Sequence, residues 1–331
     1  MDDPARQPST RSDSVKSDVF SHTMNSHSSR GPSLRLKTAV TALFLLLFHM
    51  GLASAAPLRV VTSVPDLADF ARRVGGNSVE VLSLASGKEN PHAVPLRPSY
   101  IAKIRSADLF IQMGLDMEHA YAPALLAEAR NVRLQPGREG FLDLGEEVQA
   151  LGVPAVLDRA GGDVHAKGNP HYNLDPVQAQ RMVRAIGARL ALLRPADAVQ
   201  FRTNADAYVR EIEERLGSWK ARLSGKGVRF ISYHPDFAYF AQRFGVRQEG
   251  TIEPKPGIEP GPAHMEALVR DMQTRKIGLI VKESFYSDRV PMELARRTGA
   301  VLVSVPIFVG ATPEARDYLS MMEALVSAFA K

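Results

Sequence analysis

Short apolar runs alternate with segments of helical periodicity along most of the chain. The apolar runs are rich in β-branched residues, which is typical of buried strands, whereas the other segments repeat apolar residues every three or four positions. In the first half the predicted strands are Leu58–Val64, Val79–Leu84 and Leu109–Met113, and the predicted helices are Asp66–Val74, Ser99–Ser106 and Tyr121–Ala129. Strands that alternate with helices indicate a parallel α/β sheet.

The second half of the chain repeats this alternation. Its predicted strands are Val228–Tyr233, Arg247–Ile252, Ile277–Lys282 and Val301–Val305, and its predicted helices are Phe237–Phe244, His264–Arg275, Pro291–Thr298 and Ala315–Ala330. The likeness between the halves is one of architecture, since no short-period repeat is present. A second parallel α/β sheet is therefore expected.

A long helical stretch separates the two halves. Apolar residues recur at helical spacing from about 175 to 223, and Pro195 kinks or divides the stretch because proline removes an intrahelical hydrogen bond. The preceding segment, Gln135–Asn169, is rich in Gly, Pro and Asp and shows no period. We expect an N-terminal α/β lobe over 56–174, a connecting helix over 175–224 and a C-terminal α/β lobe over 225–331. The predicted fold is thus two small parallel-sheet lobes joined by a long backbone helix, with a cleft between them.

The N-terminal segment has the three parts of a secretory signal peptide. Arg35 and Lys37 precede the apolar run Ala39–Phe48, and the small residues Ala53–Ala55 follow as a cleavage site. The run is too short to span a bilayer, which disfavours an uncleaved anchor. Residues 1–55 are therefore predicted to be a leader and signal peptide of an exported, periplasmic protein, and translation starts at Met1 or at Met24.

Composition narrows the class further. Hydrophobic content of 45% and charged content of 23% are those of a soluble globular protein. Two of the five net positive charges belong to the predicted leader. The sequence has no cluster of Lys and Arg interleaved with aromatic residues, so a nucleic-acid partner is not expected. The chain has no cysteine, so no lipid-anchoring thiol follows the cleavage site and any metal site must use His, Asp or Glu.

Four side chains that can bind metals lie next to predicted elements of both halves. His92 and His234 follow strands of different halves, Glu283 follows a further strand, and His171 precedes the long helical stretch. In open α/β sheets ligands bind beyond the carboxyl ends of the strands. Three neutral imidazoles with one carboxylate or water suit tetrahedral Zn²⁺. The interlobe cleft is therefore predicted to bind a transition-metal ion, with zinc favoured.

The residues around the histidines form three phrases. The first is Asn90–His92 followed by Arg97–Ile101, the second is Gly168–Pro176, and the third is Tyr233–Phe240 followed by Pro256–Pro260. In this order they resemble the substrate-binding proteins of zinc and manganese ABC importers, the cluster A-I solute-binding family. The resemblance covers about residues 58–330.

The resemblance implies a function and a set of ligands. In that family the histidine of each phrase binds the metal, which corresponds to His92, His171 and His234. Three histidines resemble the zinc-binding members, whereas manganese-binding relatives tend to have a carboxylate in place of the third, so Zn²⁺ is favoured over Mn²⁺. The family's role implies a monomeric, non-enzymatic receptor that delivers the ion to an ABC importer permease at the membrane.

The chain departs from the family in two places. Many members take a fourth ligand from an Asp in a stretch that aligns with Ser304–Ile307, where this chain has no carboxylate. Glu283 is the predicted substitute, with Asp288 or water as alternatives. The family's long His-rich loop is reduced here to Asp163 and His165, so metal scavenging by that loop is not expected. His119 is predicted to have a solvated or packing role.

An alternative reading is a secreted zinc hydrolase with an open three-histidine site. Three protein ligands and an open fourth position are what catalytic zinc requires, and Glu283 could then act as the base. No HExxH-type motif supports this reading. A metal-dependent adhesin or a metallochaperone is a third possibility that the sequence does not separate from the receptor.

Overall fold

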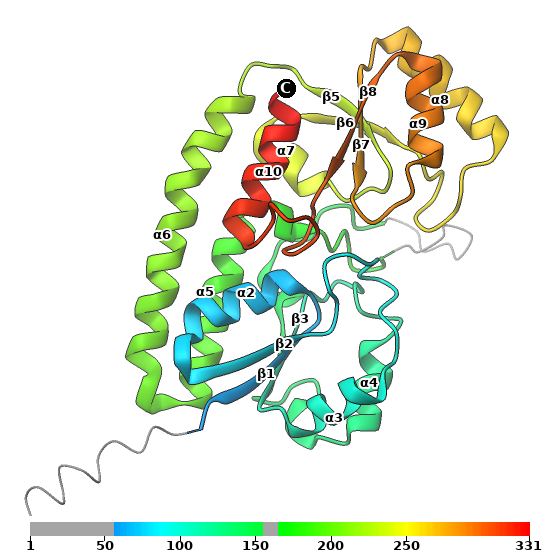
Figure 1. Cartoon of the computed structure of the whole chain (residues 1–331). Helices are drawn as coiled ribbons and strands as arrows, with labels where there is room; N and C mark the ends of the chain where they lie inside the picture. The colour runs from blue at the N-terminus through cyan, green and yellow to red at the C-terminus, as the bar shows by residue number, and fades with distance from the viewer. Residues whose placement is uncertain (1–55, 155–164) are drawn as a thin grey trace, which may run out of the picture. The chain divides into compact units, whose positions relative to one another are not determined.

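Two four-stranded parallel sheets organise the computed structural model, which describes residues 56–154 and 165–331 (Figure 1). The predicted leader and signal peptide, together with Asp163, lies outside the described residues. Residues 55–331 form one compact unit. The predicted α/β class with two parallel sheets is confirmed.

The first sheet has the strand order β2-β1-β3-β4. Its strands are β1 (Leu58–Thr62), β2 (Val79–Ser83), β3 (Leu109–Gln112) and β4 (Phe141–Asp143), and the helices α2 (Pro65–Gly75), α3 (Pro98–Ser106) and α4 (Ala122–Ala129) connect or follow them. Strand β4 lies in the segment predicted to be loop. It has three residues, too few to show a period, and it forms through parallel pairing of Phe141 with Phe110 of β3.

The second sheet has the corresponding strand order, β6-β5-β7-β8. Its strands are β5 (Arg229–Ser232), β6 (Arg247–Thr251), β7 (Leu279–Glu283) and β8 (Val301–Val305), and its helices are α7 (Ala238–Phe244), α8 (Pro262–Arg275), α9 (Arg289–Thr298) and α10 (Tyr318–Ala330). Helix α10 begins three residues later than predicted, because Asp317 and Ser320 form a capping box that ends the preceding loop.

The helical stretch between the sheets is divided at Pro195, one of the two outcomes predicted for that proline. Helix α5 (Pro176–Leu193) ends before a single 3₁₀ turn at Pro195–Asp197, and helix α6 (Ala198–Leu223) then runs back along it. The backbone of Gly187 in α5 lies against Ala205 of α6. The long helix of the fold is therefore α6 alone, about 39 Å at 1.5 Å per residue.

Helix α6 contacts helices from both halves of the chain. It packs against α2 and α10 as well as α5, and Figure 1 shows it running beside them. Trp219 of α6 is fully buried and donates its indole N–H to Glu323 of α10 at 2.9 Å. Among the described residues no helix is both long and apolar enough to cross a membrane.

Candidate metal centre

Three buried histidines from three separate loops meet in one place. His92 lies in the loop after β2, His171 precedes the turn Tyr172–Leu174 that leads into α5, and His234 follows β5. Each side chain is at most 5% exposed, and one ligand nitrogen of each lies within 4.8 Å of the others. The three histidines, predicted in strand-end and helix-start loops, thus lie together, and that they bind a metal ion stays a prediction.

Their spacing suits a tetrahedral ion. The Nε2 atoms of His92 and His171 are 3.2 Å apart. Zinc–nitrogen bonds of about 2.0–2.1 Å at tetrahedral angles place two ligand atoms about 3.3 Å apart. The centroids of the three imidazole rings are separated by 5.2, 5.6 and 5.7 Å, and one nitrogen of each ring lies within 4.8 Å of the other two. The residues present therefore fit a zinc ion.

The two Asn-Pro-His phrases build the same local turn. The side-chain oxygen of Asn90 accepts the backbone N–H of His92, and that of Asn169 accepts the backbone N–H of His171, both at 2.9 Å. Such Asx turns are a local property of asparagine, which is why the phrase can be read from sequence. Asn169 Oδ1 also lies 3.0 Å from Nδ1 of His171, which directs its Nε2 toward the other histidines.

His234 is oriented by a carboxylate that the sequence analysis missed. Its Nδ1 lies 2.7 Å from Oε2 of Glu253, a buried residue that also accepts the backbone N–H of Gly257. Carboxylates hold metal-binding histidines in this way and fix the tautomer. Glu253 comes two residues after β6 ends, so the strand-end rule that found the histidines could also have found it.

Burial favours the neutral form of two imidazoles at the centre, those of His92 and His165. Burial, then the neighbouring His171 and His165, lowers the pKa of His92 well below its usual value. Burial, then His171, His234 and His119, lowers the pKa of His165 to about 4. The ring of His165 lies 4.8 Å from that of His92, so the structure brings it to the centre although the sequence indicated no role for it.

Two buried acids adjoin the histidines. Asp236, two residues after His234, places Oδ1 2.7 Å from Nε2 of His171 and 3.7 Å from Nε2 of His234. Burial raises the pKa of Asp236, but the two histidines outweigh it and lower the pKa overall. Burial and then the Asp236 carboxylate raise the pKa of Glu283 well above its usual range. The sequence analysis missed Asp236, although it stands inside the third phrase.

Glu283, the predicted fourth ligand, lies outside the group of mutually close ligand atoms. Within 56–154 and 165–331, the group of mutually close ligand atoms contains the three histidines and not Glu283, which is fully buried at the end of β7. That Glu283 binds the ion stays a prediction. Asp288 is 62% exposed and pairs with Nζ of Lys282 at 2.9 Å. His119 is exposed, with Nδ1 2.8 Å from the backbone oxygen of Asp116.

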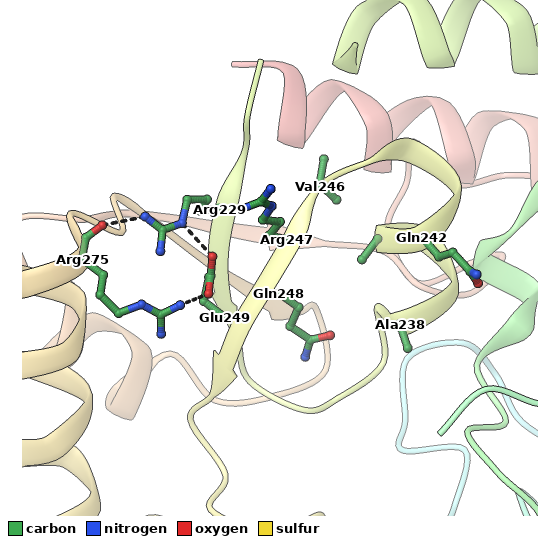
Figure 2. Close-up of a pocket in the computed structure, with 9 residues that line it drawn as sticks. Arg229, Ala238, Gln242, Val246, Arg247, Gln248, Glu249 and Arg275 are labelled. Carbon is green, nitrogen blue, oxygen red and sulfur yellow. Dashed lines mark hydrogen bonds and ion pairs between the residues drawn. The ribbon is translucent and has the colours of Figure 1, made fainter. Parts of the chain in front are cut away.

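A surface hollow of about 620 Å³ lies elsewhere, over β5, β6 and α7 (Figure 2). None of the three histidines lines it. Glu249 accepts a hydrogen bond from Arg229 at 2.7 Å and pairs with Arg275, so these three charges largely satisfy one another. The hollow is thus a feature of the second sheet's edge and not part of the metal centre.

Two four-stranded parallel sheets with three buried histidines gathered from the loops beside them define an α/β protein with a candidate metal centre. The chain belongs to the family described as zinc-uptake complex component A periplasmic, ZnuA, whose model matches residues 60–331. Members of that family are binding components of transport systems and not enzymes.

Individual relatives agree with this assignment. The chain is 28% identical over 283 residues to the high-affinity zinc uptake system protein ZnuA of Yersinia pestis, covering 80% of this chain and 86% of that protein. It is 26% identical over 307 residues to the zinc-binding lipoprotein AdcA of Streptococcus pneumoniae R6, covering 87% of this chain and 58% of that protein. The chain thus spans little more than half the length of the AdcA relatives.

Solved structures share the fold. A crystal structure of a ZnuA deletion mutant with zinc bound matches with a TM-score of 0.71 at 23% identity, covering 83% of this chain and 97% of that one. A manganese-bound periplasmic metal-binding protein from Candidatus Liberibacter asiaticus matches with a TM-score of 0.68 at 21% identity, covering 82% and 98%. At these identities the likeness is one of fold.

Proposed function

We propose that this chain is a periplasmic receptor that binds Zn²⁺ through His92, His171 and His234 and delivers it to the permease of an ABC importer. The observation that carries the proposal is the convergence of three buried imidazoles whose ligand nitrogens lie within 4.8 Å of one another, one pair at 3.2 Å. The names of the zinc-uptake relatives support the cargo and the transport role.

The ligand set supports zinc over manganese as the cargo. Imidazole nitrogen suits zinc, whereas manganese prefers carboxylate and water oxygen. Three imidazoles, two of them held by Asn169 and Glu253, make a nitrogen-rich site. Manganese-bound relatives share the fold, so the donor set and not the fold is the basis for choosing the metal.

The burial of the histidines argues against the hydrolase alternative. A catalytic zinc needs an open position that a substrate can reach. His92, His171 and His234 are 5%, 2% and 3% exposed, which disfavours the approach of a peptide or ester. A buried site suits capture of a bare ion.

Location and domain organisation belong to the same proposal. We propose that residues 1–55 direct export and are removed, and that the mature chain acts as a soluble monomer. The lobes are proposed to span 56–174 and 225–331, with 175–224 between them. The family's periplasmic description supports the location.

The test is metal content by mass spectrometry of the purified protein, followed by zinc titration of the wild type and of His234→Ala. We expect one zinc per chain and much weaker binding by the variant. His264→Ala is the matched control, because His264 lies at α8 with Nε2 3.1 Å from the backbone oxygen of Thr251. Full affinity in His234→Ala would contradict the proposed site.

A further inference from the structure

We propose that the carboxylate of Asp236 is the fourth ligand of the ion, and that Glu283 is a positioning residue beside it. This inference rests on the proposed function, since it concerns the same centre. It changes the role predicted for Glu283 from ligand to neighbour of the ligand.

Distances to the histidine nitrogens support Asp236. Oδ1 of Asp236 lies 2.7 Å from Nε2 of His171 and 3.7 Å from Nε2 of His234, on either side of the roughly 3.3 Å expected between two ligands of a tetrahedral zinc ion. The group of mutually close ligand atoms includes His92 but not Asp236. We therefore expect His92 and Asp236 to draw together when the ion binds.

The same oxygen lacks a hydrogen-bond donor. Oδ1 of Asp236 is buried 2.7 Å from Nε2 of His171, but in the neutral imidazole that donates from Nδ1 to Asn169 this Nε2 has no proton to donate. Buried polar atoms in folded proteins nearly always have a partner, and an exception calls for an explanation. A cation between the histidines would supply that partner.

Charge favours a carboxylate in the fourth position. Three neutral imidazoles would leave both charges of the ion uncompensated in a buried site, and buried charge is costly unless it is paired. Asp236 is 1% exposed and is the carboxylate nearest to two of the ligand nitrogens among the contacts that the structure records. Glu253 is already committed to Nδ1 of His234, on the side away from the ion.

Glu283 adjoins Asp236 at the end of β7. The two buried carboxyls lie close enough to interact directly. Contact with the buried Glu283 side chain would restrict the rotation of the Asp236 carboxylate. Partners of this kind orient metal ligands.

His165 is the competing candidate. Its ring lies 4.8 Å from that of His92 and 6.3 Å from that of His171, and its buried Nε2 has no hydrogen-bond partner among the described residues. It is only partly buried, and no recorded contact places its nitrogen against a ligand atom. The experiment therefore includes it.

The experiment compares Asp236→Asn, Asp236→Ala, Glu283→Gln and His165→Ala with the wild type. Zinc affinity is measured by competition with a chelating dye, and the visible spectrum of the Co²⁺-loaded protein reports the number and kind of ligands. Asp206→Asn is the matched control, because Asp206 is exposed on α6. Fluorescence of Trp219 checks that each variant is folded.

We expect both Asp236 variants to bind zinc at least about tenfold more weakly and to change the Co²⁺ spectrum, with a smaller loss for Glu283→Gln. Wild-type affinity and spectrum in both Asp236 variants would overturn the inference. So would a larger effect of Glu283→Gln or of His165→Ala than of the Asp236 variants. Absence of stoichiometric zinc binding by the wild type would instead contradict the proposed function.

Discussion

Each metal-binding nitrogen in the centre depends on what holds the other side of its ring. Asn169 holds His171 and Glu253 holds His234, whereas Nδ1 of His92 has no hydrogen-bond partner among the described residues. In an imidazole whose tautomer and orientation are fixed, the lone pair already faces the ion, so binding has no free-energy cost for ring rotation or proton transfer. We therefore expect the orientation of the rings to contribute to affinity.

Glu253 provides a direct test of this orientation. Glu253→Gln replaces a carboxylate acceptor by an amide, and we expect zinc affinity to fall about 10–100-fold while the three histidines remain in place. The measurement is the same zinc competition titration. Glu259→Gln, an exposed glutamate in the same loop, is the control and should bind as the wild type does. Unchanged affinity in Glu253→Gln would show that the hydrogen bond to His234 is not needed.

Much of the centre could be predicted from the sequence at this scale. The Asn-Pro-His turns are local, because asparagine accepts the backbone N–H two residues later in both phrases. Glu253 follows a strand end, so the rule that found the histidines could have found it, but its contact with His234 and that of Asp236 with His171 are made only by the folded chain.

Between elements, the reversal at Pro195 decides how the helices pack. Proline interrupts the helix, and the chain folds back so that α5 and α6 lie antiparallel, with a hydrogen bond of 2.6 Å from Gln180 to Glu213. Periodicity predicts a helix on each side of the proline, but it does not predict the angle between those two helices. The small residue at position 187 permits the close approach, since an added Cβ there would lie 3.0 Å from that of Ala205.

A matched pair of substitutions tests this packing. Gly187→Leu should destabilise the protein by about 1–3 kcal/mol, because the larger side chain overpacks the α5–α6 contact. Gly217→Leu in α6 should instead be neutral or stabilising by up to about 1 kcal/mol, since nothing lies within 4 Å of its added Cβ and leucine favours helix more than glycine does. Urea unfolding followed by the fluorescence of Trp219 measures both. Equal effects of the two substitutions would contradict the close contact.

Across the whole molecule, a buried carboxyl joins segments that are distant in sequence. Asp66, in the first turn of α2, accepts the backbone N–H of Val309 at 2.9 Å and the side-chain N–H of Asn173 at 3.1 Å. Asn173 also donates to the backbone oxygen of Ile307. The start of α2, the second histidine phrase and the loop after β8 thus meet at Asp66.

Because the pKa of Asp66 is raised, we expect the stability of the protein to depend on pH. Burial raises the pKa of Asp66 to about 7 from an ordinary value of 3.8. A raised pKa means that the folded state holds the proton more tightly than the unfolded chain, so the contribution is full below pH 3.8 and is lost as the pH rises through about 7. We expect the free energy of unfolding of the metal-free wild type, relative to Asp66→Asn, to decrease between pH 5 and pH 8.

Urea unfolding at the two pH values measures this difference, and Asp206→Asn serves as the control because its side chain is exposed. A difference between wild type and Asp66→Asn that is constant with pH would show that Asp66 ionises in the folded protein as it does in the unfolded chain.

The sequence by itself determined the two α/β units, the helical stretch between them and the three histidine phrases, because periodicity, turn chemistry and residue order are local properties. Tertiary structure alone decided the pairing of the short β4, the antiparallel return of α6 and the acids that adjoin the histidines. These depend on which segments exclude water from one another. The approach of Asp236 to His171 is the clearest case, since only folding brings that carboxylate to within 2.7 Å of a nitrogen more than sixty residues earlier in the chain.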